Sequence, residues 1–239
     1  MAGTAVLTQQ HRTQQLAVRA AMLRDLALLW PTWETGNISE FGQFISLAET
    51  LLGARQQESA GLAATYYRAF RRAAGVTGAA EPKLAERLLS VDVSAALRAT
   101  GLAGTLRALR AGQPPQAAAR TGFSLLAGSA IRLTLSGGRA TIEASVQADP
   151  KARGWARVTS GSPCDFCAML ASRGAVFKSE RTAGFEAHDN CACTAQPIFA
   201  GTPLPPGNER YARLWEESTA GLSGADARSA FRKALSEGS

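Results

Sequence analysis

Five side chains that bind soft metal ions lie close together in one part of the chain. All four cysteines and one of the two histidines form the pattern Cys164-x2-Cys167, then twenty residues, then His188-x2-Cys191-x-Cys193. Two thiolates separated by two residues on a tight turn can bind one tetrahedral ion, and a distant second pair completes the shell and closes the intervening loop. The spacing therefore predicts a zinc site.

Only four of these five ligands are needed for a tetrahedral ion. We expect Cys164, Cys167 and His188 to bind it together with either Cys191 or Cys193. Because alternate residues of a strand point to the same face, the Cys-x-Cys spacing does not decide between the last two. Four protein ligands leave no open position for water, so the predicted zinc is structural.

Other chemistries use similar residues. A CxxC pair can be a redox dithiol, but residues 149–163 before it show no βαβ pattern. Two disulfides, with three possible pairings, would suit a protein that works outside the cell. PCDFC matches half of the zinc deaminase signature, but no His-x-Glu precedes it. Neither His188 nor His11, which we expect in a mobile N-terminal turn, is well placed as a protease base. We expect no enzymatic activity.

The charge of the chain favours an anionic partner. The net charge is +7, and residues 113–182 carry nine Lys/Arg against four Asp/Glu, whereas residues 183–239 carry five against seven. We expect weak, sequence-independent binding to double-stranded DNA. The predicted nucleic-acid-binding residues are Arg120, Arg132, Arg139, Lys151, Arg153 and Arg157. The excess of arginine, 22 against 4 lysines, is also what genome base composition can produce.

The chain has the composition of a folded protein of the cytoplasm. It has 239 residues, of which 46% are hydrophobic and 19% charged, which is enough for a sizeable core. No stretch is long and apolar enough to span a membrane, and the N-terminus lacks the order of a signal peptide. In a reducing compartment, clustered cysteines bind metals more often than they form disulfides.

The first part of the chain is predicted to be helical. Apolar residues at steps of three and four predict a helix over 8–30, ended by Pro31, and another over 38–74. After a break at 75–82, shorter helices are expected around 84–97, 101–112, 114–135 and 137–150, separated by glycines and prolines. No strand is predicted before residue 158.

The sequence pattern changes from long helical repeats to shorter elements after Cys167. Residues 167–174 suit a two-turn helix closed by Gly174, and the short apolar runs 175–179 and 193–199 are predicted to pair as a hairpin. A proline-rich linker and two helices follow, the second beginning at Ser223. The predicted fold is mainly α: an N-terminal helical bundle (1–112), a domain with the Cys/His cluster and a zinc-stabilised β-hairpin (113–200), and a linker with C-terminal helices (201–239).

Two segments of this region resemble a known family. GWARVTSGSPCDFCAMLASRGAVF and FEAHDNCACTAQPIF are similar to the C-terminal domain of phage Mu F-like minor head proteins, also known as phage head morphogenesis proteins, above all those of actinobacterial phages. The resemblance covers about residues 115–200. Its motifs are the CxxC pair, the turn formed by Arg173, Gly174, Val176 and Phe177, and HxxCxC; the N-terminal helices carry none.

The resemblance implies a minor capsid protein near the portal vertex, inside the head, made in the host cytoplasm. Its partners would be the portal protein, the major capsid protein and packaged double-stranded DNA. Some relatives are called capsid maturation proteases, but too few residues follow residue 200 for an added enzymatic domain. A zinc-stabilised nucleic-acid-binding regulator is a further alternative, although 167–174 is too short and apolar for a recognition helix. Zinc would supply folding energy that the small module 161–199 lacks.

Overall fold

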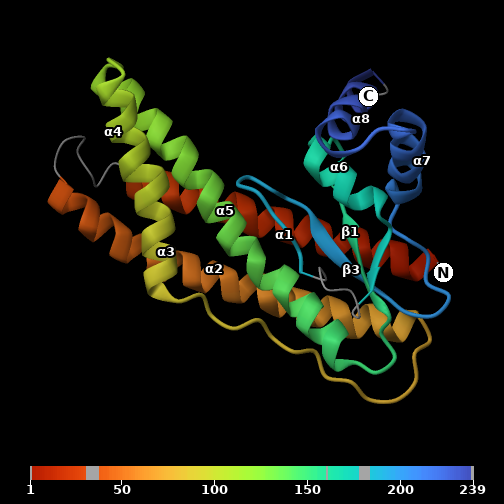
Figure 1. Ribbon diagram of the computed structural model, residues 1–239. Coiled ribbons are helices and arrows are strands. Elements are labelled where there is room, and N and C mark those ends of the chain that lie inside the picture. Colours follow the sequence, from red (N-terminus) through yellow and green to blue (C-terminus); the bar gives the residue numbers. More distant parts are fainter. Residues whose placement is uncertain (1, 31–37, 160, 178–183, 238–239) are drawn as a thin grey trace.

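Three long helices form the body of the protein in this computed structural model, which describes residues 2–30, 38–159, 161–177 and 184–237. They are α1 (Ala2–Leu29), α2 (Ile38–Ala73) and α5 (Pro115–Ala148), and they lie side by side (Figure 1). Between α2 and α5 come α3 (Ser90–Leu97), the π-helical turn η2 (Arg98–Leu102) and α4 (Ala103–Arg110). The two predicted N-terminal helices are present, and Pro31 lies outside the described residues.

One apolar core joins the long helices at the end near α3. Met22 and Leu26 of α1, Phe41 and Phe44 of α2, and Leu126 of α5 are all fully buried there. Burying such side chains stabilises the fold by roughly 1.5–3 kcal/mol each. Because α5 shares this core with α1 and α2, the three helices fold against one another.

The other half of α1 packs through polar side chains. Thr8, His11 and Gln15 are buried, and the Thr8 hydroxyl lies 2.8 Å from the Tyr66 hydroxyl. His11 stacks on the Tyr66 ring at 4.3 Å, and burial lowers the pKa of His11 to about 3, so its imidazole is neutral. The prediction that His11 lies in a mobile turn is therefore wrong, because this buried residue is in the middle of α1.

Helix α5 runs without interruption through Gly137 and Gly138, where two separate helices were predicted. A Cβ at Gly137 would lie 2.1 Å from the Gln56 carbonyl oxygen, and one at Gly138 would lie 2.9 Å from Ser59 Oγ. These glycines therefore allow α1, α2 and α5 to approach closely and do not end the helix. The intrinsic cost of glycine in a helix, about 1 kcal/mol, is offset by this packing.

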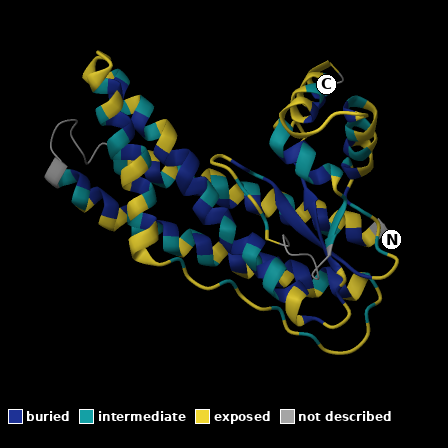
Figure 2. Ribbon diagram, viewed as in Figure 1, coloured by how far each residue is buried: buried dark blue, intermediate teal, exposed yellow. Residues whose placement is uncertain are grey.

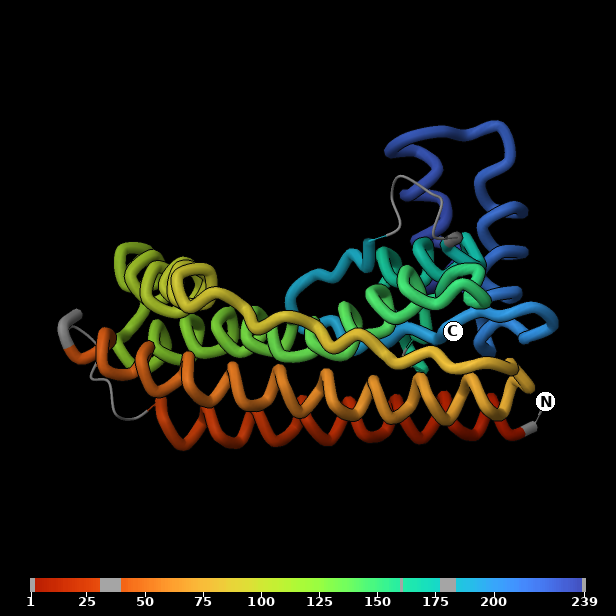
Figure 3. Tube along the Cα trace, turned by 90° about the horizontal axis from the view of Figure 1, so that it is seen from below, coloured from red at the N-terminus to blue at the C-terminus, as the bar shows by residue number. Residues whose placement is uncertain are grey.

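An extended segment, residues 79–89, runs lengthwise beside α2 and α5 towards α3 (Figure 3). The amide of Lys83 donates to Ser145 Oγ at 3.0 Å, and the amide of Ala85 donates to Thr141 Oγ1 at 2.9 Å. The helix predicted around 84–97 therefore begins only at Ser90, because side chains of α5 satisfy the backbone groups before it.

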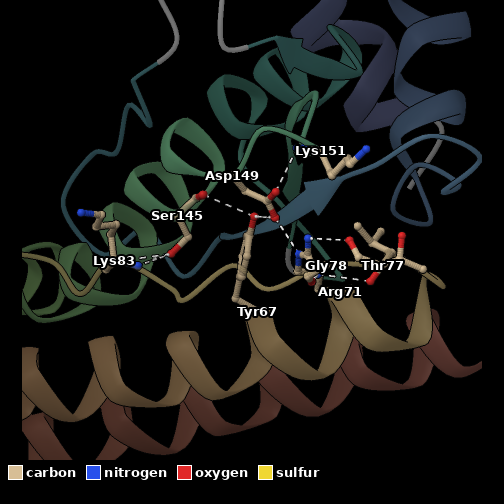
Figure 4. A network of polar contacts seen from close by, with 9 residues as sticks. Tyr67, Arg71, Thr77, Gly78, Lys83, Ser145, Asp149 and Lys151 are labelled. Atoms are coloured by element: carbon tan, nitrogen blue, oxygen red, sulfur yellow. Dashed lines mark hydrogen bonds and ion pairs between the residues drawn. The ribbon is translucent and has the colours of Figure 1, made fainter.

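A buried ion pair links the end of α2 to the end of α5 (Figure 4). Asp149, which is 1% exposed, accepts from Arg71 Nε at 2.8 Å and from the Tyr67 hydroxyl at 3.0 Å. The same guanidinium donates to the carbonyls of Val76, Thr77 and Gly78. Arg71 thus holds both the end of α5 and the start of the extended segment.

A three-stranded antiparallel sheet packs on the second half of α5. It consists of β1 (Gly154–Val158), β2 (Ala175–Phe177) and β3 (Thr194–Ile198), in the order β2-β1-β3, with Trp155 opposite both Val176 and Pro197. The predicted hairpin is therefore wrong, because the unpredicted strand β1 lies between its two arms. All residues of β1 and β3 are buried (Figure 2), so neither strand has the alternation that reveals a half-buried strand.

The remaining helices form a small satellite core. Helix α6 (Asp165–Ser172) packs against α7 (Asn208–Thr219) and α8 (Gly224–Glu237) through Ala168, Ala171, Tyr211, Phe231 and Leu235. The two-turn helix closed by Gly174 is confirmed, with Gly174 at φ 71°. The mainly helical fold with a small sheet and two C-terminal helices is likewise confirmed, while the domain limits at 112 and 200 remain predictions. Among the described helices, none is long and apolar enough to cross a bilayer.

Candidate metal centre

The five predicted ligands meet between the N-terminus of α6 and the chain leading into β3. Cys164 is the N-cap of α6, and Cys167 lies one turn further on. His188 Nε2 lies 3.0 Å from Cys164 Sγ and 3.4 Å from Cys167 Sγ. Cys167 Sγ lies 3.6 Å from Cys191 Sγ. The structure thus brings the two halves of the sequence pattern together at one site.

The ligand atoms form two overlapping groups. Cys164, Cys167 and His188 make one, and Cys167, Cys191 and Cys193 make the other; within each group all ligand atoms lie within 4.8 Å of one another. In a tetrahedral zinc site, two ligand atoms are about 3.5–3.8 Å apart, given the usual Zn–S and Zn–N lengths. Each group therefore brings three ligand atoms close enough to share one ion, and Cys167 belongs to both groups. Both Cys191 and Cys193 remain candidates for the fourth position.

The imidazole of His188 is held in the tautomer that a metal ligand requires. Its Nδ1 lies 2.6 Å from the backbone carbonyl oxygen of Asp189. Because a carbonyl oxygen only accepts, Nδ1 carries the hydrogen and donates this hydrogen bond. Nε2, which faces the two sulfurs, then has a free lone pair. A backbone partner of this kind commonly orients a metal-binding histidine.

A tight turn places Cys191 after His188. Asn190 has φ 64°, a left-handed conformation that asparagine tolerates, and the amide of Cys191 donates to the His188 carbonyl at 3.1 Å. The Asn190 amide donates to the Gly128 carbonyl of α5 at 3.0 Å. A Cβ at Gly128 would lie 2.7 Å from Asn190 Nδ2, so this glycine allows the turn to rest on α5.

Arg139 fixes the cysteine segment from the side of α5. Its guanidinium donates to the carbonyl of Cys193 at 2.9 Å and to that of Cys191 at 2.6 Å. Hydrogen bonds from Cys167 and Cys193, helped by the positive charge of Arg139, lower the pKa of Cys191. This favours a thiolate at Cys191, the form that binds metal.

Arg157 and Phe185 complete the wall of the site. Arg157 is 2% exposed, donates to the Glu186 carbonyl at 2.6 Å and lies 3.9 Å from the centre of the Phe185 ring. Its Nη1 is 3.9 Å from Cys167 Sγ. The Phe185 ring also stacks on Trp155 at 5.1 Å. Phe185 and Glu186 are therefore anchored to β1 just before the chain reaches His188.

The structure corrects part of the predicted nucleic-acid interface. Arg139 and Arg157 are buried against the cysteine segment, so their guanidinium groups cannot reach phosphates. Arg132 is half-buried and pairs with Asp189 at 2.8 Å. Arg120, Lys151 and Arg153 are exposed, and their contact with DNA remains a prediction.

Glu143 lies one turn beyond Arg139 and has no hydrogen-bond partner for its buried Oε1 among the described residues. Burial raises the pKa of Glu143 to about 7, although the Phe185 amide and the charges of Arg139 and Arg157 act in the opposite direction. Nothing in the sequence pattern indicated the burial of Glu143 or the structural role of Arg139.

The fold and the site define a mainly helical protein whose Cys/His cluster joins a small sheet to a helical body and could hold one metal ion. The chain belongs to the VG15 protein family, a family of phage proteins, because the model of this family matches residues 3–218. No curated protein and no solved structure matches the chain.

Proposed function

We propose that this phage protein is a minor capsid protein of a tailed phage that acts in head assembly near the portal, with one structural zinc ion at the Cys/His cluster. Membership of a phage family supports this proposal, as does the resemblance of about residues 115–200 to Mu F-like minor head proteins. The observation that carries it is that the family-like motifs, CxxC and HxxCxC, converge on a single site.

The zinc ion, when bound, would cross-link the start of α6 to the segment before β3. Cys164 and Cys167 would supply the first half of its shell, and His188 with Cys191 or Cys193 the second. Three of the four sulfurs, those of Cys167, Cys191 and Cys193, belong to buried residues, and four protein ligands leave no position for a reacting water. This arrangement supports the proposal that the ion has a structural role.

Helix α6 would pass the effect of the metal to the C-terminal helices. Cys164 and Cys167 lie on the cluster side of α6, whereas Ala168 and Ala171 pack against α7 and α8. Asp165, at the start of α6, pairs with Arg232 of α8 at 2.6 Å. Zinc would therefore set the position of α7 and α8, which would present a surface to the portal protein or the major capsid protein.

The test uses phage that carry Cys167→Ser, because Cys167 belongs to both ligand groups. Mass spectrometry of purified heads would measure the amount of this protein and the processing of the capsid protein, with Ser162→Ala, an exposed neighbour, as the control. We expect Cys167→Ser to reduce incorporation several-fold and Ser162→Ala to leave it unchanged. Normal incorporation together with unprocessed capsid protein would instead indicate a protease. Absence of the wild-type protein from heads would indicate a regulator.

A further inference from the structure

The hairpin formed by α4 and the first half of α5 is purely basic. Between Asp92 and Glu143 the chain has no Asp or Glu and six arginines, which are Arg98, Arg107, Arg110, Arg120, Arg132 and Arg139. Arg132 and Arg139 are engaged with the cysteine segment, by an ion pair to Asp189 and by hydrogen bonds to Cys191 and Cys193. Of the other four, Arg107, Arg110 and Arg120 lie towards the outer part of the hairpin, and Arg98 lies further back, in η2.

These four arginines face solvent. Arg98, Arg107, Arg110 and Arg120 are exposed, and none of them takes part in an ion pair with another described residue. Like charges that are not neutralised locally repel one another and weaken the free protein slightly. A bound polyanion would remove this repulsion.

Close packing fixes where the arginines stand along the hairpin. A Cβ at Gly122 of α5 would lie 1.9 Å from Thr105 Oγ1, and one at Gly101 would lie 2.5 Å from Leu126 Cδ1. These contacts set the antiparallel register, which places Arg107 at the level of Arg120. Arg110 lies one turn from Arg107, so three guanidinium groups occupy the last turns before the tip.

The position of the hairpin makes it accessible to a large ligand. It extends away from the sheet and the C-terminal helices (Figure 1), and exposed residues dominate its tip (Figure 2). Leu125 is the exposed large apolar residue of this hairpin, at 42%. A protein partner would be expected to need a broader apolar surface at the centre of its interface.

We propose that the α4–α5 hairpin, together with the η2 turn that leads into it, binds the sugar–phosphate backbone of double-stranded DNA through Arg98, Arg107, Arg110 and Arg120. Guanidinium groups bind phosphate oxygens in a bidentate manner and keep their charge at every physiological pH. The proposal deepens the proposed function, because packaged DNA is the polyanion that a head protein meets. Of the nucleic-acid-binding residues predicted from the sequence, this surface includes Arg120.

The test compares two variants of equal net charge. One changes the four hairpin arginines to glutamine; the control changes Arg24, Arg72, Arg213 and Arg228, which are exposed on other helices, to glutamine. Binding of a labelled 30-base-pair duplex of arbitrary sequence is measured by fluorescence anisotropy from low to high salt. Circular dichroism confirms that both variants fold.

We expect the hairpin variant to bind at least about tenfold more weakly at low salt, and its salt slope to fall by about 3 to 4, since each phosphate contact contributes roughly 0.9. The control should stay within about threefold of the wild-type affinity. Equal losses of DNA affinity in both variants, or no DNA binding by the wild-type protein, would overturn this proposal. Neither result would bear on the proposed role in head assembly, which is tested by incorporation into heads. A hairpin variant that binds DNA normally but is missing from heads would show that this surface contacts a head protein.

Discussion

Arg139 and Cys193 are joined by a buried hydrogen bond of 2.9 Å, from the guanidinium Nε of α5 to the backbone carbonyl that precedes β3. A second bond from the same guanidinium reaches the Cys191 carbonyl at 2.6 Å. One side chain therefore holds both cysteines of the Cys-x-Cys pair at a fixed distance from α5. The helical body therefore positions the backbone of both candidates for the fourth position of the metal shell.

Arg139→Lys should destabilise the protein by about 2–4 kcal/mol, because the single nitrogen of lysine cannot stand in the places of both Nε and Nη2, so one buried carbonyl loses its partner. Arg132→Lys is the matched control, since Arg132 lies two turns earlier on α5 and forms a half-exposed ion pair worth at most about 1 kcal/mol. Chemical denaturation followed by circular dichroism measures both. Equal effects of the two substitutions would argue against a special role of Arg139.

Asp149→Asn should cost about 3–5 kcal/mol in the free energy of unfolding, because it leaves the buried Arg71 guanidinium without a counter-ion. Glu81→Gln, which breaks the exposed pair with Arg68, should cost less than about 1 kcal/mol. A small loss at Asp149 would mean that the carbonyls of residues 76–78 suffice to satisfy Arg71.

The effect of Asp149 should also depend on pH. Burial alone would raise the pKa of Asp149, but hydrogen bonds from Arg71, the Lys151 amide and Tyr67 outweigh it and lower the pKa. The carboxylate therefore stabilises the fold above its unfolded pKa of about 3.9, and this contribution is lost as the pH falls below it. The difference in stability between wild type and Asp149→Asn should be constant from pH 5 to 7 and shrink below pH 4.

Glu143→Gln should have the opposite pH dependence. Because burial raises the pKa of Glu143 to about 7, the protonated form favours the fold, and this advantage is lost as the pH rises through 7. We expect the variant and the wild type to have the same free energy of unfolding near pH 4. At pH 8 the free energy of unfolding of the variant should be higher by about 1–2 kcal/mol. Glu216→Gln, at an exposed position of α7, should show no such crossover. A variant that is less stable than wild type at pH 8 would show that the carboxylate is paired.

The candidate ligands could be predicted from the sequence because spacing alone encodes them. Cys164 and Cys167 lie one helical turn apart, and His188 and Cys191 bracket a tight turn, so local geometry decides their direction. The choice between Cys191 and Cys193 could not be predicted, since both sulfurs face Cys167 across the fold.

The helical body was predictable from apolar periodicity, but its interruptions were not. Gly137 and Gly138 are local signals for a break, and the fold uses them for close contact with Gln56 and Ser59. Strand β1 was missed because both of its faces are buried, which removes the alternating pattern. Arg139 and Arg157 were assigned to DNA because composition shows charge and does not show burial.

The central claim is that the Cys/His cluster is a structural zinc site, and elemental analysis of protein purified without chelator tests it most directly. The account predicts about one zinc ion per chain, its loss in Cys167→Ser, and release of thiols when a chelator removes it. Protease digestion should then cleave first within residues 161–199 and in the α7–α8 pair, while α1, α2 and α5 stay protected. Protein without zinc whose four cysteines are paired as disulfides would contradict the account.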